Sequence, residues 1–480
     1  MKSNLPKIIF ATLSLCSLVG LKAQIQANLL IIHTDEHSFR TLSCYRELMS
    51  EDQAYVWGPG LGVETPNIDR IAKEGAICMN YYASSPVCTP SRASLITGLY
   101  PQATGAWKNG EHLRKDVPTL AQILKENAYA TSYVGKWHLE GHDKYKFNIK
   151  YSAGFDDIRY MMQGGHAPYF HITSEGMEGI SNKRAENFPE NEIVHLTDYF
   201  TEKSLEILER DKDHPFFLML SIPDPHTPDY ARPPYHTMYD NMDLQMPKTM
   251  APEYSAKKPA WAKNSRNEAA GFDAKALRQY FGMVKHIDDN VGQILSFLEK
   301  NNLSDNTIVV FTADHGDMFF EHNRRNKGLP YEASSKIPFV IRYPGKIMPG
   351  KVIRKAYTNV DFAPTILDIM GIEADENFHG LNTSDDFLNS KSLIEDKRIT
   401  YFREANGSWV AAVNNRYKLV VSKSEKPWLY DLKKDPDELI NHYNKPFYKK
   451  VSIRFMEELE TQMITYDEPA LKGKSKLVYK

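Results

Sequence analysis

Short apolar runs alternate with helix-like segments over most of this chain, and this alternation limits the possible folds more than any other feature. Apolar runs of four to eight residues are typical of buried strands, and apolar residues at a spacing of three to four are typical of helices. Strands that alternate with helices predict an α/β fold, a three-layer α/β/α sandwich around a mostly parallel central sheet. The predicted strands are NLLIIH, AICMNYY, ATSYVGKW, FFLMLSI, TIVVFTADHG and IPFVIRYPG, and the main helices are expected at 65–75, 91–97, 117–129, 273–300 and 359–372.

The pattern changes towards the end of the chain. Residues 391–480 contain short alternating runs separated by turn signals such as Asn406-Gly407, and a helix is expected from about 446 to 465. This pattern predicts a smaller C-terminal α+β subdomain with antiparallel strands. We therefore expect an α/β catalytic domain at 24–390. Within it, 141–192 and 223–267 have no clear periodicity and are expected to form long loops near the site.

The N-terminus has the features of a secretory signal. Lysines precede an apolar run that ends at Leu21, and Lys22-Ala23 follows it. The run is too short to span a bilayer comfortably, and Cys16 lacks the small preceding residue of a lipoprotein signal. We expect 1–23 to be removed and the protein to be exported without a membrane anchor, into the periplasm or the medium.

Charge and cysteine content narrow the function classes. The formal net charge of −2 gives no reason to expect nucleic acid or an anionic membrane surface as a partner. After cleavage three cysteines remain, too few for a disulfide scaffold. A bond between Cys44 and Cys78 is left open, and Cys88 then stands alone in an oxidising compartment.

Acidic groups follow two of the predicted strands. Asp35-Glu36 comes directly after NLLIIH, and Asp314-His315 follows the apolar part of TIVVFTADHG. Each pair alone fits an ordinary turn. Because the carboxyl ends of parallel strands share one sheet edge, two such pairs favour a site for a hard divalent cation.

Basic groups follow other strands of the same predicted sheet. Lys136 and His138 alternate along an extended segment and should face the same side. His226, Lys327 and Arg92 also follow strands, although each alone could be an ordinary solvated residue. Together with the acidic pairs they predict an oxyanion pocket beside a cation.

The stretch Cys88-Thr89-Pro90-Ser91-Arg92 resembles the C-x-P-S-R signature of formylglycine-dependent sulfatases of the alkaline-phosphatase superfamily. The motifs GKWHL, PHTP, ADHG and NKGLPYE are similar to other motifs of that family and occur in its order. The resemblance extends from Asn28 to about His442. It implies an alkaline-phosphatase-like fold and hydrolysis of sulfate esters.

The resemblance gives Cys88 a specific role. In the family this cysteine is oxidised to Cα-formylglycine by a formylglycine-generating or sulfatase-maturating enzyme, which is therefore an expected partner. The aldehyde hydrates to a gem-diol, whose second hydroxyl can expel sulfate, whereas a thiolate would leave an adduct with no easy exit. Amides at the start of the following helix would help hold an anion.

The resemblance also implies a calcium ion. Its expected ligands are Asp35, Glu36, Asp314 and His315, together with the modified Cys88. Two ligands depart from the family pattern: Glu36 stands where Asp or Gln is common, and His315 where Asn is common. Nitrogen suits calcium less well than oxygen, which makes His315 the weaker assignment.

The remaining roles follow from the same resemblance. Lys136 and Lys327 are expected to neutralise the sulfate oxygens, and Arg92 to steady the modified cysteine. His138 is expected to accept a proton from the sulfated intermediate. Either Lys327 or His226 protonates the leaving alcohol, and the sequence leaves this choice open.

Substrate contacts are expected on the loops around the pocket. The candidates are polar or aromatic residues that suit a sugar or an anion, and each could equally be a solvated loop residue. They are Trp107, His112, His166, Tyr169, Arg232, Arg324 and Arg325.

The resulting hypothesis is an exported sulfatase that acts on a sulfated carbohydrate. The nearest alternative is a phosphonate monoester or phosphodiester hydrolase with the same signature. A non-catalytic glycan-binding relative is a third reading, which the complete set of motif residues opposes. The sugar, the sulfated position, endo or exo action and the oligomeric state stay open.

Overall fold

The structure is a computed structural model that describes most of residues 26–471. The predicted signal peptide at 1–23 and the predicted domain boundary at 390/391 lie outside the described residues, so both stay predictions. The gaps within the described range are 142–143, 168, 174–175, 182–183, 185–186, 190–191, 256–257, 264–267, 375 and 390–397.

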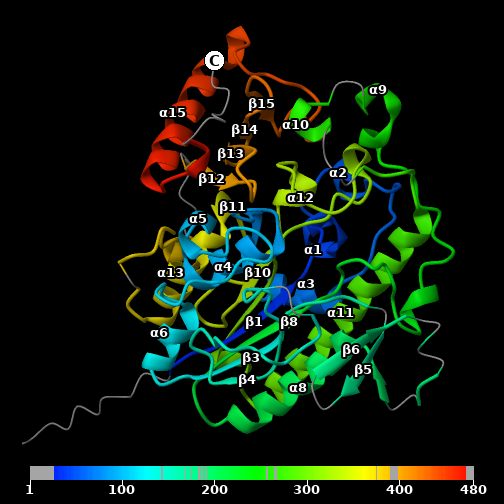
Figure 1. The fold of residues 1–480 in the computed structure, drawn as a ribbon, viewed down its shortest axis with the longest axis vertical. Helices are drawn as coiled ribbons and strands as arrows, with labels where there is room; N and C mark the ends of the chain where they lie inside the picture. Colours follow the sequence, from blue (N-terminus) through cyan, green and yellow to red (C-terminus); the bar gives the residue numbers. More distant parts are fainter. Residues whose placement is uncertain are drawn as a thin grey trace, which may run out of the picture.

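An eight-stranded sheet forms the centre of the fold, in the order β11-β2-β10-β9-β1-β8-β3-β4 (Figure 1). Strand β10 is antiparallel to both of its neighbours, and all other pairs are parallel. This confirms the predicted mostly parallel sheet. The strands are β1 (Asn28–Thr34), β2 (Ala76–Tyr82), β3 (Ala130–Lys136), β4 (Asp157–Met162), β8 (Phe216–Ile222), β9 (Thr307–Ala313), β10 (Phe339–Arg342) and β11 (Lys351–Thr358).

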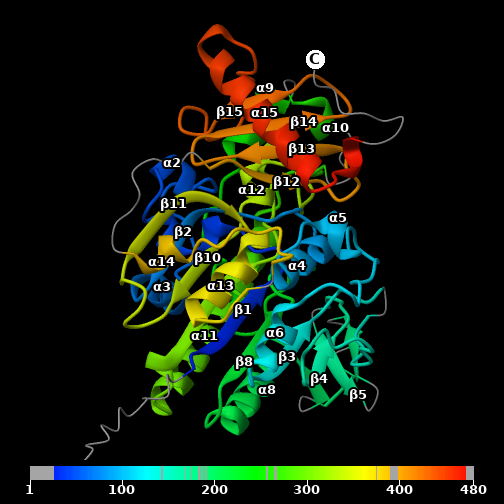
Figure 2. The same cartoon turned by 90° about the vertical axis from the view of Figure 1, so that its left-hand side faces the viewer.

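Helices cover both faces of this sheet (Figures 1 and 2). Successive side chains of β1 point to opposite faces: Leu29 and Ile31 belong to one apolar cluster, and Leu30 and Ile32 to the other. Because both faces are buried, the central strands are continuously apolar in sequence. The first cluster includes α4 (Cys88–Thr97), α6 (Leu120–Glu126) and α13 (Phe362–Met370), and the second includes α3 (Pro66–Lys73), α8 (Leu196–Asp211) and α11 (Ala274–Lys300).

The C-terminal part is a four-stranded antiparallel sheet packed against a long helix, as the sequence predicted. It lies at one end of the molecule, above the central sheet in Figure 2. Its elements are β12 (Thr400–Arg403), β13 (Trp409–Val413), β14 (Tyr417–Ser422), β15 (Trp428–Asp431) and α15 (Lys449–Thr465). The other helices are short: α1 (Ser43–Arg46), α2 (Glu51–Ala54), α5 (Pro101–Thr104), α9 (Pro252–Ser255), α10 (Ala260–Lys263), α12 (Glu332–Ser335) and α14 (Ser384–Leu388).

Two local expectations were wrong. The segment 141–192 contains the edge strand β4 and most of a small antiparallel sheet rather than a long loop; polar side chains and glycines hide the strand pattern there. The helix expected from Ser91 begins three residues earlier, at Cys88. The small sheet consists of β5 (Tyr169–Thr173), β6 (Gly176–Ile180) and β7 (Ile193–Val194).

Two further observations concern the helices and the cysteines. None of the helices in the described part of the chain combines the length and apolarity needed to cross a membrane. Cys44, Cys78 and Cys88 are all buried and free, so the disulfide left open by the sequence is absent among the described cysteines.

Candidate active site

The predicted site residues meet at the carboxyl edge of the central sheet. Asp35 follows β1 directly, Asp314 follows β9, Lys136 is the last residue of β3, and His226 comes shortly after β8. The order of the strands brings these four chain segments together, as expected for ligand sites of open α/β sheets.

The turn after β1 is held in an unusual backbone conformation. Glu36 has φ of 59°, and its carbonyl oxygen accepts a 2.8 Å hydrogen bond from the Tyr280 hydroxyl. Its amide donates to Oδ1 of Asp314 over 3.1 Å. These bonds fix the direction of both carboxylates that follow the strand, and a non-glycine residue at positive φ is often found at functional sites.

Cys88 is the first residue of α4, after an extended Val87. The sequence suggested that free helix amides would help hold an anion here. One of them is occupied, because the Thr89 amide donates to Oδ1 of Asn109 over 3.0 Å. The helix ends as predicted at Gly98, which has φ of 63°.

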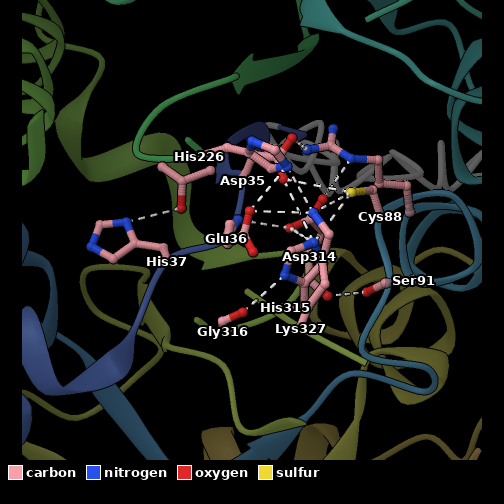
Figure 3. Close-up of polar contacts among 12 residues, drawn as sticks. Asp35, Glu36, His37, Cys88, Ser91, His226, Asp314, His315, Gly316 and Lys327 are labelled. Atoms are coloured by element: carbon pink, nitrogen blue, oxygen red, sulfur yellow. Dashed lines mark hydrogen bonds and ion pairs between the residues drawn. The ribbon is translucent and has the colours of Figure 1, made fainter. Parts of the chain in front are cut away.

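The Cys88 sulfur lies inside a charged cluster (Figure 3). It is 3.2 Å from Nε2 of His315, 3.2 Å from Nζ of Lys327 and 3.8 Å from Oδ1 of Asp35. Burial opposes ionisation, but the charges of Lys136 and Lys327 hold the pKa of the Cys88 thiol well below its usual range. The position is therefore built to accommodate negative charge.

Arg92 braces the centre of the cluster from one helical turn further on. Its Nε donates to Oδ2 of Asp314 over 2.8 Å, and Nη2 lies 3.4 Å from Oδ2 of Asp35. Its Nη1 donates to the Lys136 carbonyl oxygen and to Oγ of Ser221, over 2.9 and 2.7 Å. Arg92 thus holds the ends of four strands, β1, β3, β8 and β9, in one arrangement.

The acidic side of the cluster fits a divalent cation. The candidate ligand atoms of Asp35, Cys88, Asp314 and His315 all lie within 4.8 Å of one another. Nδ1 of His315 lies 3.0 Å from the Gly316 carbonyl, which can only accept, so in the neutral ring Nε2 has its lone pair towards the cluster. Glu36 stands outside this group of four, but its buried Oε1 has no hydrogen-bond partner. An oxygen-rich set with one orphaned carboxylate oxygen suits calcium.

The basic side contains two lysines and two stacked histidines. Nζ of Lys136 contacts Asp35 and lies 2.9 Å from Nε2 of His166. The ring of His166 stacks on His226 with centroids 3.8 Å apart, and Nε2 of His226 lies 2.7 Å from Nζ of Lys327. These nitrogens, beside the Cys88 sulfur, form a pocket that can neutralise an oxyanion.

His138 lies at the rim of this pocket. It is partly exposed, and burial together with the charge of Lys136 lowers its pKa. It is close enough to Cys88 to contribute to the lowered pKa of the thiol. A neutral imidazole at this position can accept a proton.

Only some of the predicted substrate contacts lie in the charged cluster. His166 belongs to it. Three arginines form ion pairs with carboxylates outside it: Arg232 with Asp198, Arg324 with Glu268 and Arg325 with Asp229. Trp107 is half-buried beneath Nζ of Lys108. His112 forms an isolated antiparallel β-bridge with Glu140 through the backbone. The Tyr169 hydroxyl is hydrogen-bonded to that of Tyr230.

Three supporting residues escaped the sequence analysis. They are Asn109, Ser221 and Tyr280, which hold Thr89, Arg92 and Glu36. Ser221 had a detectable signal, since it is the only polar residue in the run FFLMLSI. The other two lie in segments that the sequence does not connect to the site.

Comparison with known proteins agrees with this geometry. Residues 27–372 match the family model Sulfatase, and residues 320–465 match the model N-sulphoglucosamine sulphohydrolase, C-terminal. The chain is 29% identical to an arylsulfatase of Clostridium perfringens over 81% of this chain and 87% of that protein. It is 26% identical to an N-acetylglucosamine-6-O-sulfatase of Bacteroides thetaiotaomicron over 100% of this chain and 94% of that protein.

Solved structures show the same fold. One is a protein in complex with its substrate D-glucosamine-2-N,6-O-disulfate, with a TM-score of 0.72, 25% identity and coverage of 92% of this chain and 98% of that chain. Another is a putative sulfatase from Bacteroides fragilis, with a TM-score of 0.73, 25% identity and coverage of 94% and 98%. Because the Sulfatase model matches well over half of the sequence, the chain belongs to the sulfatase family and is a sulfuric ester hydrolase with an alkaline-phosphatase-like fold.

Proposed function

We propose that the chain is an exported sulfatase that hydrolyses a sulfate ester of a carbohydrate, using calcium and a formylglycine formed from Cys88. The observation that carries this proposal is the buried Cys88 sulfur, which lies 3.2 Å from both Nζ of Lys327 and Nε2 of His315. A formylglycine-generating or sulfatase-maturating enzyme carries out the modification of Cys88 in the cell.

We assign each side chain of the site a separate role in the reaction. When present, the hydrated aldehyde supplies the nucleophile, and calcium held by Asp35, Glu36, Asp314 and His315 supplies positive charge against the sulfate. Lys136 and Lys327 bind sulfate oxygens, and the burial of the site strengthens this attraction. Arg92 keeps Asp35 and Asp314 in place.

Two histidines, His138 at the rim and His226 on the basic side of the pocket, transfer the protons. His138, whose pKa is lowered by burial, accepts a proton at a ring nitrogen. His226 lies 2.9 Å from Oε2 of Glu36 and donates a proton to the leaving alcohol. Each such role is worth about two to four powers of ten in rate.

A sulfated sugar is the substrate class that relatives support. One relative is named for N-acetylglucosamine-6-O-sulfate, one is an ulvan-active sulfatase of Formosa agariphila, and one was solved with a disulfated glucosamine. Among the predicted substrate contacts, His166 has the strongest support because it reaches Lys136. Trp107, Arg232, Arg324 and Arg325 stay predicted substrate contacts, and Arg324, which is 1% exposed, would have to leave its present partners to reach a glycan.

Intact-mass analysis of protein from its native host tests the chemistry directly. Conversion of Cys88 to formylglycine lowers the mass by about 18 Da, and an active protein with an unmodified thiol would refute the proposal. Turnover of a paired aryl sulfate and aryl phosphodiester tests the reaction. We expect a clear preference for the sulfate, and the opposite preference would favour the phosphodiester alternative.

Export and domain organisation are tested separately. N-terminal sequencing of the protein from the periplasm or medium should begin close to Gln24, after removal of 1–23. Protein found only in the cytoplasm with an intact N-terminus would contradict export. Limited proteolysis should cut near 390, between the proposed domains 24–390 and 391–480.

A further inference from the structure

The short helix α12 connects three segments that form the site. The amide of Gly316, directly after His315, donates to the Ser334 carbonyl over 2.9 Å. The amide of Gly328, directly after Lys327, donates to Oγ of Ser334 over 3.1 Å. The strand that leads to Cys88 is joined as well, through the Ala83 amide and the Ser335 carbonyl at 2.9 Å. The position of α12 therefore affects the geometry of the whole cluster.

The contact between α12 and the turn after β9 is tight. A Cβ atom added at Gly316 would lie 2.1 Å from the carbonyl oxygen of Ala333, a distance that real structures do not show. A shift of α12 towards this turn is therefore blocked. The Lys327 side of α12 is joined differently: a Cβ at Gly328 would meet nothing within 4 Å, and the contact is the hydrogen bond from the Gly328 amide to Oγ of Ser334. Because a hydrogen bond to a side chain yields more easily than a packed backbone contact, we expect a small movement of α12 to displace Lys327 more than His315.

Two buried charges from the C-terminal part hold the segment that joins Lys327 to α12. Nζ of Lys418, on β14, donates to the Pro330 carbonyl over 2.8 Å and lies 2.7 Å from Oε1 of Glu332. Glu438 completes the arrangement: its Oε1 lies 2.8 Å from Nζ of Lys418, and its Oε2 accepts the Glu332 amide over 2.7 Å. Lys418 is 0% exposed and Glu438 3%.

A four-residue helix has little stability of its own, so these contacts determine where α12 lies. Buried ion pairs are expensive to desolvate, and apolar residues of similar volume often stabilise a fold as well or better. What an apolar residue cannot supply is a hydrogen bond of fixed direction to the Pro330 carbonyl and the Glu332 amide. The charges are thus better suited to fixing a position than to stabilising a core.

We infer that Lys418 and Glu438 are positioning residues, which fix the segment from Lys327 to Glu332 so that Nζ of Lys327 meets the Cys88 position. The inference rests on the proposed function, because it assigns Lys327 to the sulfate pocket. It gives the C-terminal sheet a part in catalysis, although no residue of that sheet contacts the described cluster through an observed bond. Lys418 is expected to act on the reaction mainly through Lys327, because the close contact at Gly316 leaves the turn after β9 little room to move.

A double-mutant cycle on the matured, calcium-loaded enzyme tests this route. We expect Lys418→Met to lower kcat for an aryl sulfate about tenfold, since small misplacements of a catalytic group have effects of this size. In a Lys327→Ala background, the same substitution should change kcat less than about twofold, because its route of action is gone. Equal fold-losses in both backgrounds would overturn the inference and indicate a general structural effect.

The substitutions Glu438→Gln and Glu468→Gln form a matched comparison. Glu438→Gln should lower kcat severalfold and should lose that effect in the Lys327→Ala background. Glu468 lies in a comparable buried ion pair with Arg403, 2.8 Å apart, in the same part of the chain. Glu468→Gln should lower the melting temperature and leave kcat unchanged, and an equal loss of kcat from both variants would overturn the inference. If Lys418→Met does not fold, the comparison of Glu438→Gln with Glu468→Gln still tests the inference.

Two further readouts separate this inference from the proposed function. Calorimetric titration with calcium should give the same affinity in Lys418→Met as in wild type, because Asp314 and His315 are anchored by β9. Lost calcium affinity would contradict action through Lys327. If Lys327→Ala alone leaves kcat unchanged, the role proposed for Lys327 fails, and the inference built on it fails too. If Lys327→Ala lowers kcat and the cycle is additive, only the positioning inference fails.

Discussion

Nζ of Lys327 lies 2.7 Å from Nε2 of His226, and both nitrogens approach the same carboxylate oxygen of Glu36. Nδ1 of His226 faces the Thr227 carbonyl at 2.7 Å and must therefore carry a proton. Burial lowers the pKa of His226, but Glu36 overcomes this effect and raises it to about 10. While Glu36 keeps its full charge, this shift favours the protonated ring, which is placed to act as the acid.

We therefore predict that His226→Ala affects poor leaving groups most. For a sugar sulfate, kcat/KM should fall by about two to four powers of ten, the usual range for a general acid. For para-nitrophenyl sulfate, whose leaving group needs no protonation, the loss should be much smaller. Lys327→Ala should lower both rates alike. A leaving-group dependence seen for Lys327→Ala instead would make Lys327 the acid.

Cys88 and Cys78 are both buried free cysteines, but only Cys88 lies in the charged cluster. We predict that Cys88→Ala abolishes turnover and leaves the circular dichroism spectrum and calcium binding largely intact. Cys78→Ala, in the middle of β2, should keep kcat and lower the free energy of unfolding by about 1 kcal/mol. Appreciable turnover by Cys88→Ala would point to another nucleophile.

The sequence was sufficient to predict the sheet edge because both faces of the central strands are buried. Runs such as NLLIIH and TIVVFTA are continuously apolar, and a change to Asp35 or Asp314 marks the point where each strand ends. The family signature then assigned roles to residues that strand patterns alone could only bring near one another. The structure shows these residues within bonding distance.

Other features depend on contacts that no local pattern encodes. The strand DIRYMM at the sheet edge is only partly buried, which hides its alternation. The arginines Arg232 and Arg325 resembled anion ligands in sequence, yet their partners Asp198 and Asp229 come from other segments. Likewise, nothing near Lys418 in the sequence indicates that it reaches α12.

Asp314 serves both the proposed cation site and Arg92, so its charge should matter for metal affinity. We predict that Asp314→Asn weakens calcium binding at least about tenfold. A loss of this size is already common when a residue that only hydrogen-bonds to a metal ligand is changed. Millimolar calcium should raise the melting temperature of wild type and much less that of the variant. Asp198→Asn, which alters a carboxylate paired with Arg232, should keep the wild-type affinity. Equal calcium affinities for wild type and Asp314→Asn would remove Asp314 from the ligand set.

His322 makes the acid stability of the fold testable. Its ring stacks on Tyr331 with centroids 3.7 Å apart, and the residue is 4% exposed. Burial, with a smaller contribution from Lys258, lowers the pKa of His322 from 6.5 to about 3. Between these two values the unfolded chain binds a proton that the folded chain does not bind, so this group destabilises the fold as the pH falls.

We therefore predict that His322→Phe, which keeps the stacked ring, removes this part of the acid sensitivity. Below pH 6 the wild type should lose about 1.4 kcal/mol per pH unit relative to the variant, and above pH 7 the difference between them should be constant. Urea unfolding between pH 7.5 and pH 4.5 measures this difference, with the exposed His214→Phe as a control that keeps the wild-type slope. Parallel stability curves for wild type and His322→Phe would mean that His322 keeps its proton in the folded state, and that the ring on Tyr331 is solvated rather than buried.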